Sequence, residues 1–176
     1  MSTSGARDAA WWIDHLSLKS HPEGGSFRET YRADETYGGD ALPSRYGGAA
    51  RAVATSIYYL LERGQRSRLH RLASDELWYF HAGDPITLHL LDHAGGYRTR
   101  PLGLDVEAGE VPQLAIVRGT WFGATLEHGA QAGAAGYSLV GCVVAPGFDF
   151  ADFELADEAE ILDQFPEHRM SLAKLL

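Results

Sequence analysis

The stretch Gly64–Gly83, GQRSRLHRLASDELWYFHAG, decides the fold of this chain. His70 follows the first glycine after five residues, and six residues separate Glu76 from the last glycine. Leu72 stands two positions after His70. Glycines favour turns, and the aromatic and branched residues of ELWYFHA favour a strand. The stretch therefore indicates two neighbouring strands that carry an imidazole and a carboxylate.

Strand-like runs continue on both sides of this stretch. They are short, rich in β-branched and aromatic residues, and separated by turns that contain Gly, Pro and Asp. Many short strands with turns between them predict an all-β sandwich or barrel. The runs are Ser26–Arg32, Arg51–Glu62, Glu76–Ala82, Ile86–Asp92, Pro112–Phe122 and Tyr137–Ala145.

Short helices are expected at both ends, over about residues 8–16 and about residues 158–165. Trp11, Trp12 and Leu16 share one face at helical spacing, and Pro166 stops the second helix. The chain has 176 residues and shows no internal repeat. We therefore expect a single domain over 1–176, with its core over about 18–155.

Composition narrows the classes of partner. The net charge is -9, which repels nucleic acid and anionic membranes, so neither is an expected partner. The N-terminus contains no apolar run of a secretory signal, and the cytoplasm is the expected location. Cys142 is the one cysteine and lies in an apolar run, so we expect a buried structural thiol.

The pattern in Gly64–Gly83 resembles the first signature of the cupin superfamily, G-x5-H-x-H-x3-E-x6-G, with Leu72 in place of the second histidine. Further patches are similar to a poorly characterised family of bacterial and fungal cupins of the RmlC-like type. The resemblance implies an RmlC-like jelly-roll β-barrel, a ligand pocket within it, and frequent dimers. The patches are His21–Arg32, Ala54–Leu61, His70–Pro85 and Gly136–Phe150.

The resemblance also raises the question of a metal. Metal-dependent cupins hold iron, manganese, nickel or zinc with three histidines and one glutamate. Here His70 and Glu76 occupy two of those positions, while Leu72 and Phe122 occupy the other two and have no donor atom. We therefore expect no metal cofactor. The alternative is a weakly bound divalent ion at His70 and Glu76.

Alternation along the strands selects candidate pocket residues. The resemblance places Glu76 inside the barrel, and side chains of equal parity share a face, so Trp78 and Phe80 should point the same way. Arg68, His70 and Leu72 should form the matching face of the preceding strand. The candidate ligand-binding residues are Arg68, Tyr58, Trp78, Phe80, Gln113, Trp121 and Phe122.

Arginines are concentrated around the same stretch. If they flank the pocket, they would suit a phosphate or carboxylate on the ligand. The alternative is a set of surface arginines paired with nearby acids. The residues are Arg51, Arg63, Arg66, Arg68 and Arg71.

His70 and Glu76 are the candidate catalytic residues, as an acid–base pair in the pocket. The function expected is binding of a small polar, aromatic or sugar-like molecule, with metal-free isomerase or epimerase activity in which His70 is the base. Tyr58 or Tyr59 would be the acid, and the sequence selects neither. The alternatives are a non-catalytic binding or sensing module, in which His70 and Glu76 only fill the barrel, and a metal-dependent oxygenase or lyase.

A homodimer is the expected assembly. A jelly roll has edge strands, and an unpaired edge invites association with another chain. The segments Ser26–Arg32 and Ala54–Leu61 are the candidates for pairing across two chains.

Overall fold

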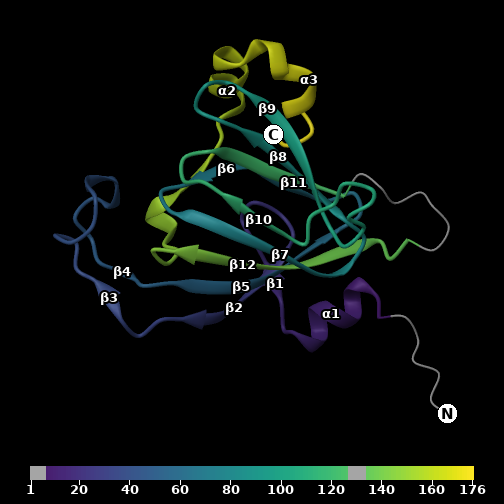
Figure 1. Cartoon of the computed structure of the whole chain (residues 1–176), viewed down its shortest axis with the longest axis horizontal. Coiled ribbons are helices and arrows are strands. Elements are labelled where there is room, and N and C mark those ends of the chain that lie inside the picture. Colours follow the sequence, from purple (N-terminus) through teal and green to yellow (C-terminus); the bar gives the residue numbers. More distant parts are fainter. Residues whose placement is uncertain (1–6, 127–133) are drawn as a thin grey trace.

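The computed structural model describes residues 7–126 and 134–176, and within them two antiparallel sheets pack face to face (Figure 1). The first sheet runs in spatial order β1 (Lys19–Ser20), β2 (Ser26–Arg32), β5 (Thr55–Glu62), β12 (Tyr137–Ala145), β7 (Asp75–Gly83) and β10 (Gln113–Ile116). The second runs β13 (Phe153–Leu155), β6 (Arg66–Leu72), β11 (Trp121–Thr125), β8 (Ile86–Leu91) and β9 (Tyr97–Leu102). The expected all-β jelly roll is confirmed.

The chain changes sheet between successive long strands. β5 belongs to the first sheet, β6 to the second, β7 to the first and β8 to the second. A polar residue on β6 therefore faces a polar residue on β7 across the interior instead of lying beside it. This crossing sets the geometry of the site.

The main apolar core lies between the sheets and explains the apolar run of β12. This strand is hydrogen-bonded to β5 on one side and β7 on the other. Its inward residues Val140, Cys142 and Val144 join the central core, and its outward residues Tyr137 and Leu139 pack near the N-terminal helix. Because both faces of β12 are covered, its sequence is continuously hydrophobic and does not alternate between apolar and polar residues.

Both expected terminal helices are present. α1 (Ala9–His15) is capped by Asp8, and the indole of Trp12 donates to the hydroxyl of Tyr137 at 2.8 Å. α2 (Glu158–Gln164) is capped by Asp157. A further short helix, α3 (Arg169–Leu172), was not expected from the sequence. The C-terminal segments cover the outer face of the second sheet, where they bury an apolar cluster.

Several strand assignments needed the structure. The expected run Pro112–Phe122 divides into β10 and β11, which lie in different sheets. The run Arg51–Glu62 divides into β4 (Arg51–Ala52) and β5, and β4 pairs with β3 (Thr36–Tyr37) in a separate ribbon. β9 was not expected, because its residues are mostly exposed and polar. An edge strand of this kind lacks the apolar alternation by which strands are recognised.

Of the two segments expected to pair across a dimer, only β2 lies towards a sheet edge. Ala54–Leu61 overlaps β5, which lies between β2 and β12, so its backbone groups are already used and that part of the prediction is wrong. β2 pairs with β1 only at Ser26 and Phe27. Among the described strands, the rest of the outer side of β2 is unpaired.

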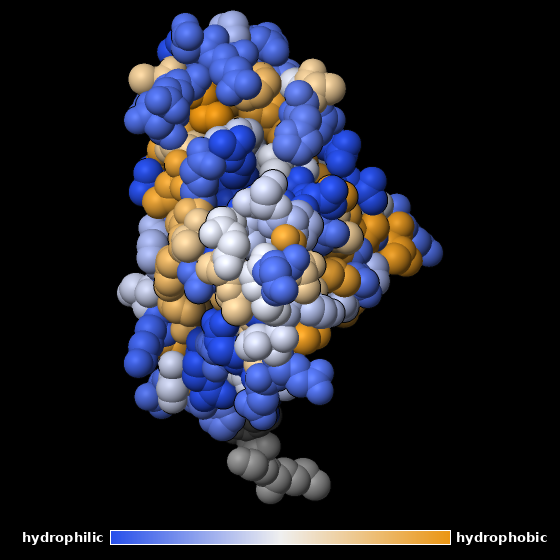
Figure 2. Space-filling model, turned by 90° about the vertical axis from the view of Figure 1, so that its left-hand side faces the viewer, coloured by the Kyte–Doolittle hydropathy of each residue, from blue (hydrophilic) through white to orange (hydrophobic). Residues whose placement is uncertain are grey.

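The side of the molecule shown in Figure 2 is predominantly hydrophilic, with hydrophobic residues in separate patches. In the described ranges, no helix combines the length and the apolar character needed to cross a membrane.

Candidate functional site

A cavity of about 280 Å³ lies between the two sheets. Residues of both sheets line it, together with the turn before β2 and the segment between β12 and β13. Its polar groups come mainly from His21, Glu23, His70 and Glu76, and its walls are largely aromatic. The aromatic lining residues are Phe27, Tyr59, Trp78, Phe148, Phe150 and Phe153.

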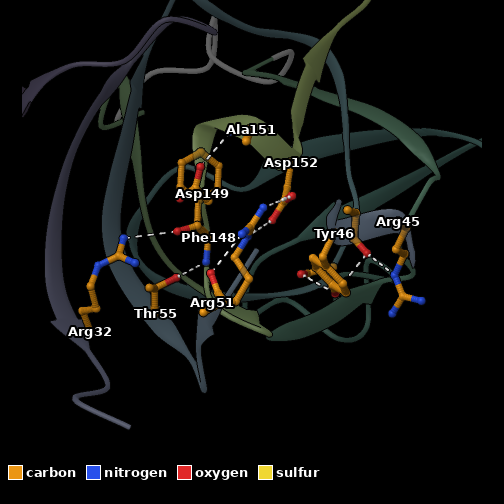
Figure 3. Close-up of polar contacts among 12 residues, drawn as sticks. Arg32, Arg45, Tyr46, Arg51, Thr55, Phe148, Asp149, Ala151 and Asp152 are labelled. Atoms are coloured by element: carbon orange, nitrogen blue, oxygen red, sulfur yellow. Dashed lines mark hydrogen bonds and ion pairs between the residues drawn. The ribbon is translucent and has the colours of Figure 1, made fainter. Parts of the chain in front are cut away.

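The segment between β12 and β13 is fixed as one wall of this cavity (Figure 3). The backbone N–H of Phe148 donates to the hydroxyl of Thr55 at 2.9 Å, and Arg32 donates to the Phe148 carbonyl at 3.2 Å. At the other end, Arg51 makes a bidentate ion pair with Asp152 at 2.6 and 2.7 Å. These anchors present a row of phenylalanine rings to the cavity.

A β-bulge in β6 decides which of its side chains point inward. Phe122 of β11 lies opposite His70, but Ala124 lies opposite Ser67, so β6 carries one extra residue between these pairs. Ser67 and His70 are therefore buried, and Arg68 is exposed. The expectation that Arg68 shares the inward face of His70 is wrong, because the bulge breaks the alternation.

The turn before β2 supplies a carboxylate that the sequence analysis did not select. Oε2 of Glu23 lies 3.2 Å from Nε2 of His70, and the hydroxyl of Ser67 donates to Oε1 of Glu23 at 3.0 Å. The positive φ of Gly24 and its close approach to the Arg66 carbonyl leave no room for a Cβ. Gly24 thus allows the turn to pack against β6. A charged residue beside two glycines in HPEGG was the available signal.

The other nitrogen of His70 fixes its tautomer. Nδ1–H donates to the backbone carbonyl of Arg68 at 2.7 Å, so Nε2 of the neutral ring is an acceptor. Burial lowers the pKa of His70 to about 4, and burial raises the pKa of Glu23. Because the neutral ring carries its proton on Nδ1, any proton between Nε2 and Oε2 of Glu23 comes from the carboxyl. We call this arrangement the Glu23–His70 pair.

Glu76 stands apart from that pair. It projects from β7, on the opposite sheet from His70, and is 7% exposed. Its Oε2 atom has no hydrogen-bond partner among the described residues. Burial, with the nearby charge of Glu23, raises the pKa of Glu76 to about 8. The expected direct pairing of His70 with Glu76 is replaced by Glu23 with His70, because the strands belong to different sheets.

The aromatic candidates separate into two groups. Trp78 lines the cavity, and the ring of Phe122 packs on His70 with centroids 4.0 Å apart. Of the two tyrosines, Tyr59 lines the cavity and donates to the Gly24 carbonyl at 2.9 Å. Tyr58 lies on the other face of β5, against His81.

Phe122 and the remaining candidates lie outside the described lining of the cavity. Phe80 is half-buried against the core, and Gln113 is exposed on the edge strand β10. Trp121 belongs to the apolar cluster beneath the C-terminal helices, where Arg71 lies 4.4 Å from its ring centroid. Strand parity alone does not distinguish the two sides of a sheet when both are covered.

The five arginines expected near the pocket form ion pairs elsewhere or are exposed. Arg51 pairs with Asp152, Arg71 with Glu154 and Arg63 with Asp84. Arg66 and Arg68 are exposed. Since none of these arginines is among the described lining residues, the alternative of ordinary ion pairs and surface positions describes them better than a ligand site does.

The site is a poor fit for the metal of metal-dependent cupins. Leu72 lines the cavity and Phe122 packs on His70, so two ligand positions carry side chains without a donor atom. In the parts of the chain that the structure describes, no group of three or more His, Cys, Asp and Glu side chains is arranged to hold a metal ion. We therefore derive no chemistry through a metal.

Two antiparallel sheets that enclose such a cavity are the architecture that the cupin resemblance implied. The chain belongs to DUF985, a family of the cupin superfamily, and the family profile matches residues 10–156. A hypothetical protein from Leishmania major is 36% identical, with 96% of this chain and 98% of that chain covered and a TM-score of 0.86. A protein from Shewanella oneidensis is 40% identical, with 96% of each chain covered and a TM-score of 0.82.

More distant structures share the fold alone. Oxalate decarboxylase from Bacillus subtilis is 14% identical, with a TM-score of 0.52, and the match covers 89% of this chain and 37% of that chain. No curated protein matches the chain significantly.

Proposed function

We propose that the cavity binds a small polar, aromatic or sugar-like molecule and moves a proton on it, as a metal-independent isomerase or epimerase with His70 as the base. The observation that carries the proposal is the position of two proton-carrying groups on opposite sheets. His70 projects from β6 and Glu76 from β7, and both line one cavity. A ligand between them meets a proton acceptor on one side and a donor on the other.

The protonation states at neutral pH support these roles. The lowered pKa of His70 leaves its ring neutral, and the raised pKa of Glu76 keeps its carboxyl protonated. In the proposed step, the Glu23–His70 pair takes a proton from a carbon next to a carbonyl group. Glu76 gives its proton to the opposite side of that carbon, which inverts the configuration. Exchange with solvent then restores both groups.

Solvent exchange tests this proposal. The protein is incubated in D₂O with a neutral ketose, its amino derivative and its acid derivative, and deuterium next to the carbonyl is followed by NMR. We expect incorporation with at least one of them, and a loss of about a hundredfold or more in His70→Ala and Glu76→Gln. His89→Ala is the control, since His89 is equally buried and bonds Tyr97 and Thr125. Absence of exchange in the unmodified protein, or its persistence in His70→Ala, would contradict the proposal.

A non-catalytic binding module is the second candidate, and one observation favours it. Both nitrogens of His70 already have partners, and a pKa of about 4 makes the ring a weak base. In that case the ligand quenches the fluorescence of Trp78 with no deuterium incorporation. Binding without exchange therefore separates the two functions.

We also propose that the site works without a resident transition metal. The support is the pair of apolar residues, Leu72 and Phe122, at two cupin ligand positions. Elemental analysis of protein purified without a histidine tag should give well below one iron, manganese, nickel or zinc per chain. About one metal per chain would refute this, and a weak divalent ion at His70 and Glu76 would be removed by dialysis.

A homodimer joined along the outer side of β2 remains a proposal. It is supported by the unpaired backbone groups of that strand beyond Phe27 in the described part of the sheet. Light scattering should give about twice the chain mass of 19.2 kDa. A mass of one chain at every concentration would exclude the dimer.

A further inference from the structure

The charges at the rim of the cavity are predominantly negative. Arg32 is the one permanent cation among the described lining residues, and it donates to both carboxylate oxygens of Glu29 at 3.0 and 2.7 Å. These hydrogen bonds raise the pKa of Arg32, and the charge of Asp149 adds to the effect. One guanidinium thus faces two carboxylates. An anion that approaches the cavity meets net negative charge, whereas a cation is attracted.

The interior also lacks a positive group to receive an anion. Burial lowers the pKa of both His21 and His70, so both rings are neutral at neutral pH. An anionic ligand would lose its hydration there without a charged partner, which is costly. Glu76, by contrast, presents a carboxyl with an oxygen that has no hydrogen-bond partner in the described structure. A cationic donor would satisfy this group, and its charge would stabilise the carboxylate that forms when Glu76 gives up its proton, which Gln cannot form.

The aromatic walls also favour a positively charged ligand. The faces of aromatic rings carry negative charge density and attract cations within about 6 Å of the ring centre. Phenylalanine rings supply this attraction without a competing hydrogen bond. The rings available are Phe27, Tyr59, Trp78, Phe148, Phe150 and Phe153.

We infer that the ligand of this cavity is a small organic cation, with an ammonium or similar nitrogen group seated against Glu76 and between the aromatic walls. This inference rests on the proposed function, since it names the class of molecule that the same site takes. The cavity of about 280 Å³ has the volume of roughly nine water molecules. A molecule of about ten non-hydrogen atoms therefore fills it.

Three probes of one shape and different charge test the inference: benzylammonium, benzyl alcohol and benzoate. Dissociation constants are measured by calorimetry on the full chain at neutral pH. We expect benzylammonium to bind at least about tenfold more tightly than benzoate, which corresponds to one charge-assisted contact. Benzyl alcohol should lie between them.

Two variants locate the effect. Glu76→Gln should weaken benzylammonium about tenfold and leave benzyl alcohol within about twofold. Glu107→Gln removes an exposed carboxylate from the loop before β10, with the same change of net charge, and should leave all three constants unchanged. Phe150 is 56% exposed, so Phe150→Leu keeps the fold and apolar bulk while it removes one ring face. It should weaken benzylammonium about threefold more than benzyl alcohol.

The outcomes separate this inference from the proposed function. Benzoate binding as tightly as benzylammonium, or Glu76→Gln weakening the alcohol and the ammonium equally, overturns the cation assignment alone. If none of the probes binds, the cation assignment fails, and deuterium exchange alone decides the proposed function. If the cation preference holds but the protein exchanges no deuterium, the cation assignment stands and the proposed catalysis fails.

Discussion

His70→Ala is expected to lower the melting temperature and to abolish the response of the protein to its ligand. The side chain of His70 is 3% exposed, and both of its nitrogens have partners. Its removal takes away the ring that lies 3.2 Å from Oε2 of Glu23 and opens space beside Phe122. Together these effects cost about 2–4 kcal/mol in the free energy of unfolding. For a chain of this length the melting temperature should fall by roughly 5–15 °C.

The melting temperature alone does not separate a functional His70 from a structural one, because the ring is buried in either case. His89→Ala provides the matched control, since His89 is 0% exposed and hydrogen-bonded but lies outside the described lining of the cavity. Both variants should melt early, as followed by circular dichroism. Only His70→Ala should lose tryptophan quenching by benzylammonium and deuterium exchange. A His70→Ala protein that keeps both responses would end the assignment of this residue to the site.

The protein is expected to lose stability as the pH rises from about 6.5 to about 8, and Glu76→Gln is expected to remove much of that loss. The pKa of Glu76 is about 8 in the folded chain against an ordinary value of 4.5. Between these values the folded state binds more protons than the unfolded state. Stability from the buried neutral carboxyl is therefore complete below pH 4.5 and disappears as the pH rises towards 8.

His70 acts in the opposite direction over a lower range. Its pKa is about 4 when folded and 6.5 ordinarily, so its contribution to stability is present above pH 6.5 and is lost as the pH falls towards 4. The pKa of Glu23 is raised, so its contribution to stability is lost as the pH rises, like that of Glu76. The pKa of His21 is lowered, so its contribution is lost as the pH falls, like that of His70. The two kinds of group oppose each other below about pH 6.5, and above it only the carboxyl groups contribute.

Chemical denaturation at several pH values measures this effect. One carboxyl contributes at most about 1.4 kcal/mol per pH unit, so we expect a loss of roughly 1–2 kcal/mol from Glu76 between pH 6.5 and 8. Glu76→Gln should match the unmodified protein near pH 5 and exceed its stability near pH 8. Glu107→Gln, which changes an exposed carboxylate, should retain the full decline. An equal decline in Glu76→Gln and the unmodified protein would show that Glu76 is already ionised at neutral pH.

The sequence by itself determined the fold and the position of its main polar residues. Turn glycines and alternating apolar residues are local signals, and they placed β12 at Tyr137–Ala145 and β7 within one residue at each end. The resemblance of Gly64–Gly83 to a cupin signature implied the cupin fold. The resemblance placed Glu76 inside the barrel, and alternation along β7 then placed Trp78 on the same face, where it lines the cavity.

Only the tertiary structure decided what those residues do together. Glu23 and Ser67 are 44 positions apart, and their contact depends on how the turn before β2 packs against β6. The bulge that turns Arg68 outward exists only in the pairing of β6 with β11. The choice of Tyr59 over Tyr58 depends on which face of β5 meets the second sheet. Local patterns fix the strands, whereas the protons and charges in the cavity depend on contacts between segments that the sequence keeps far apart.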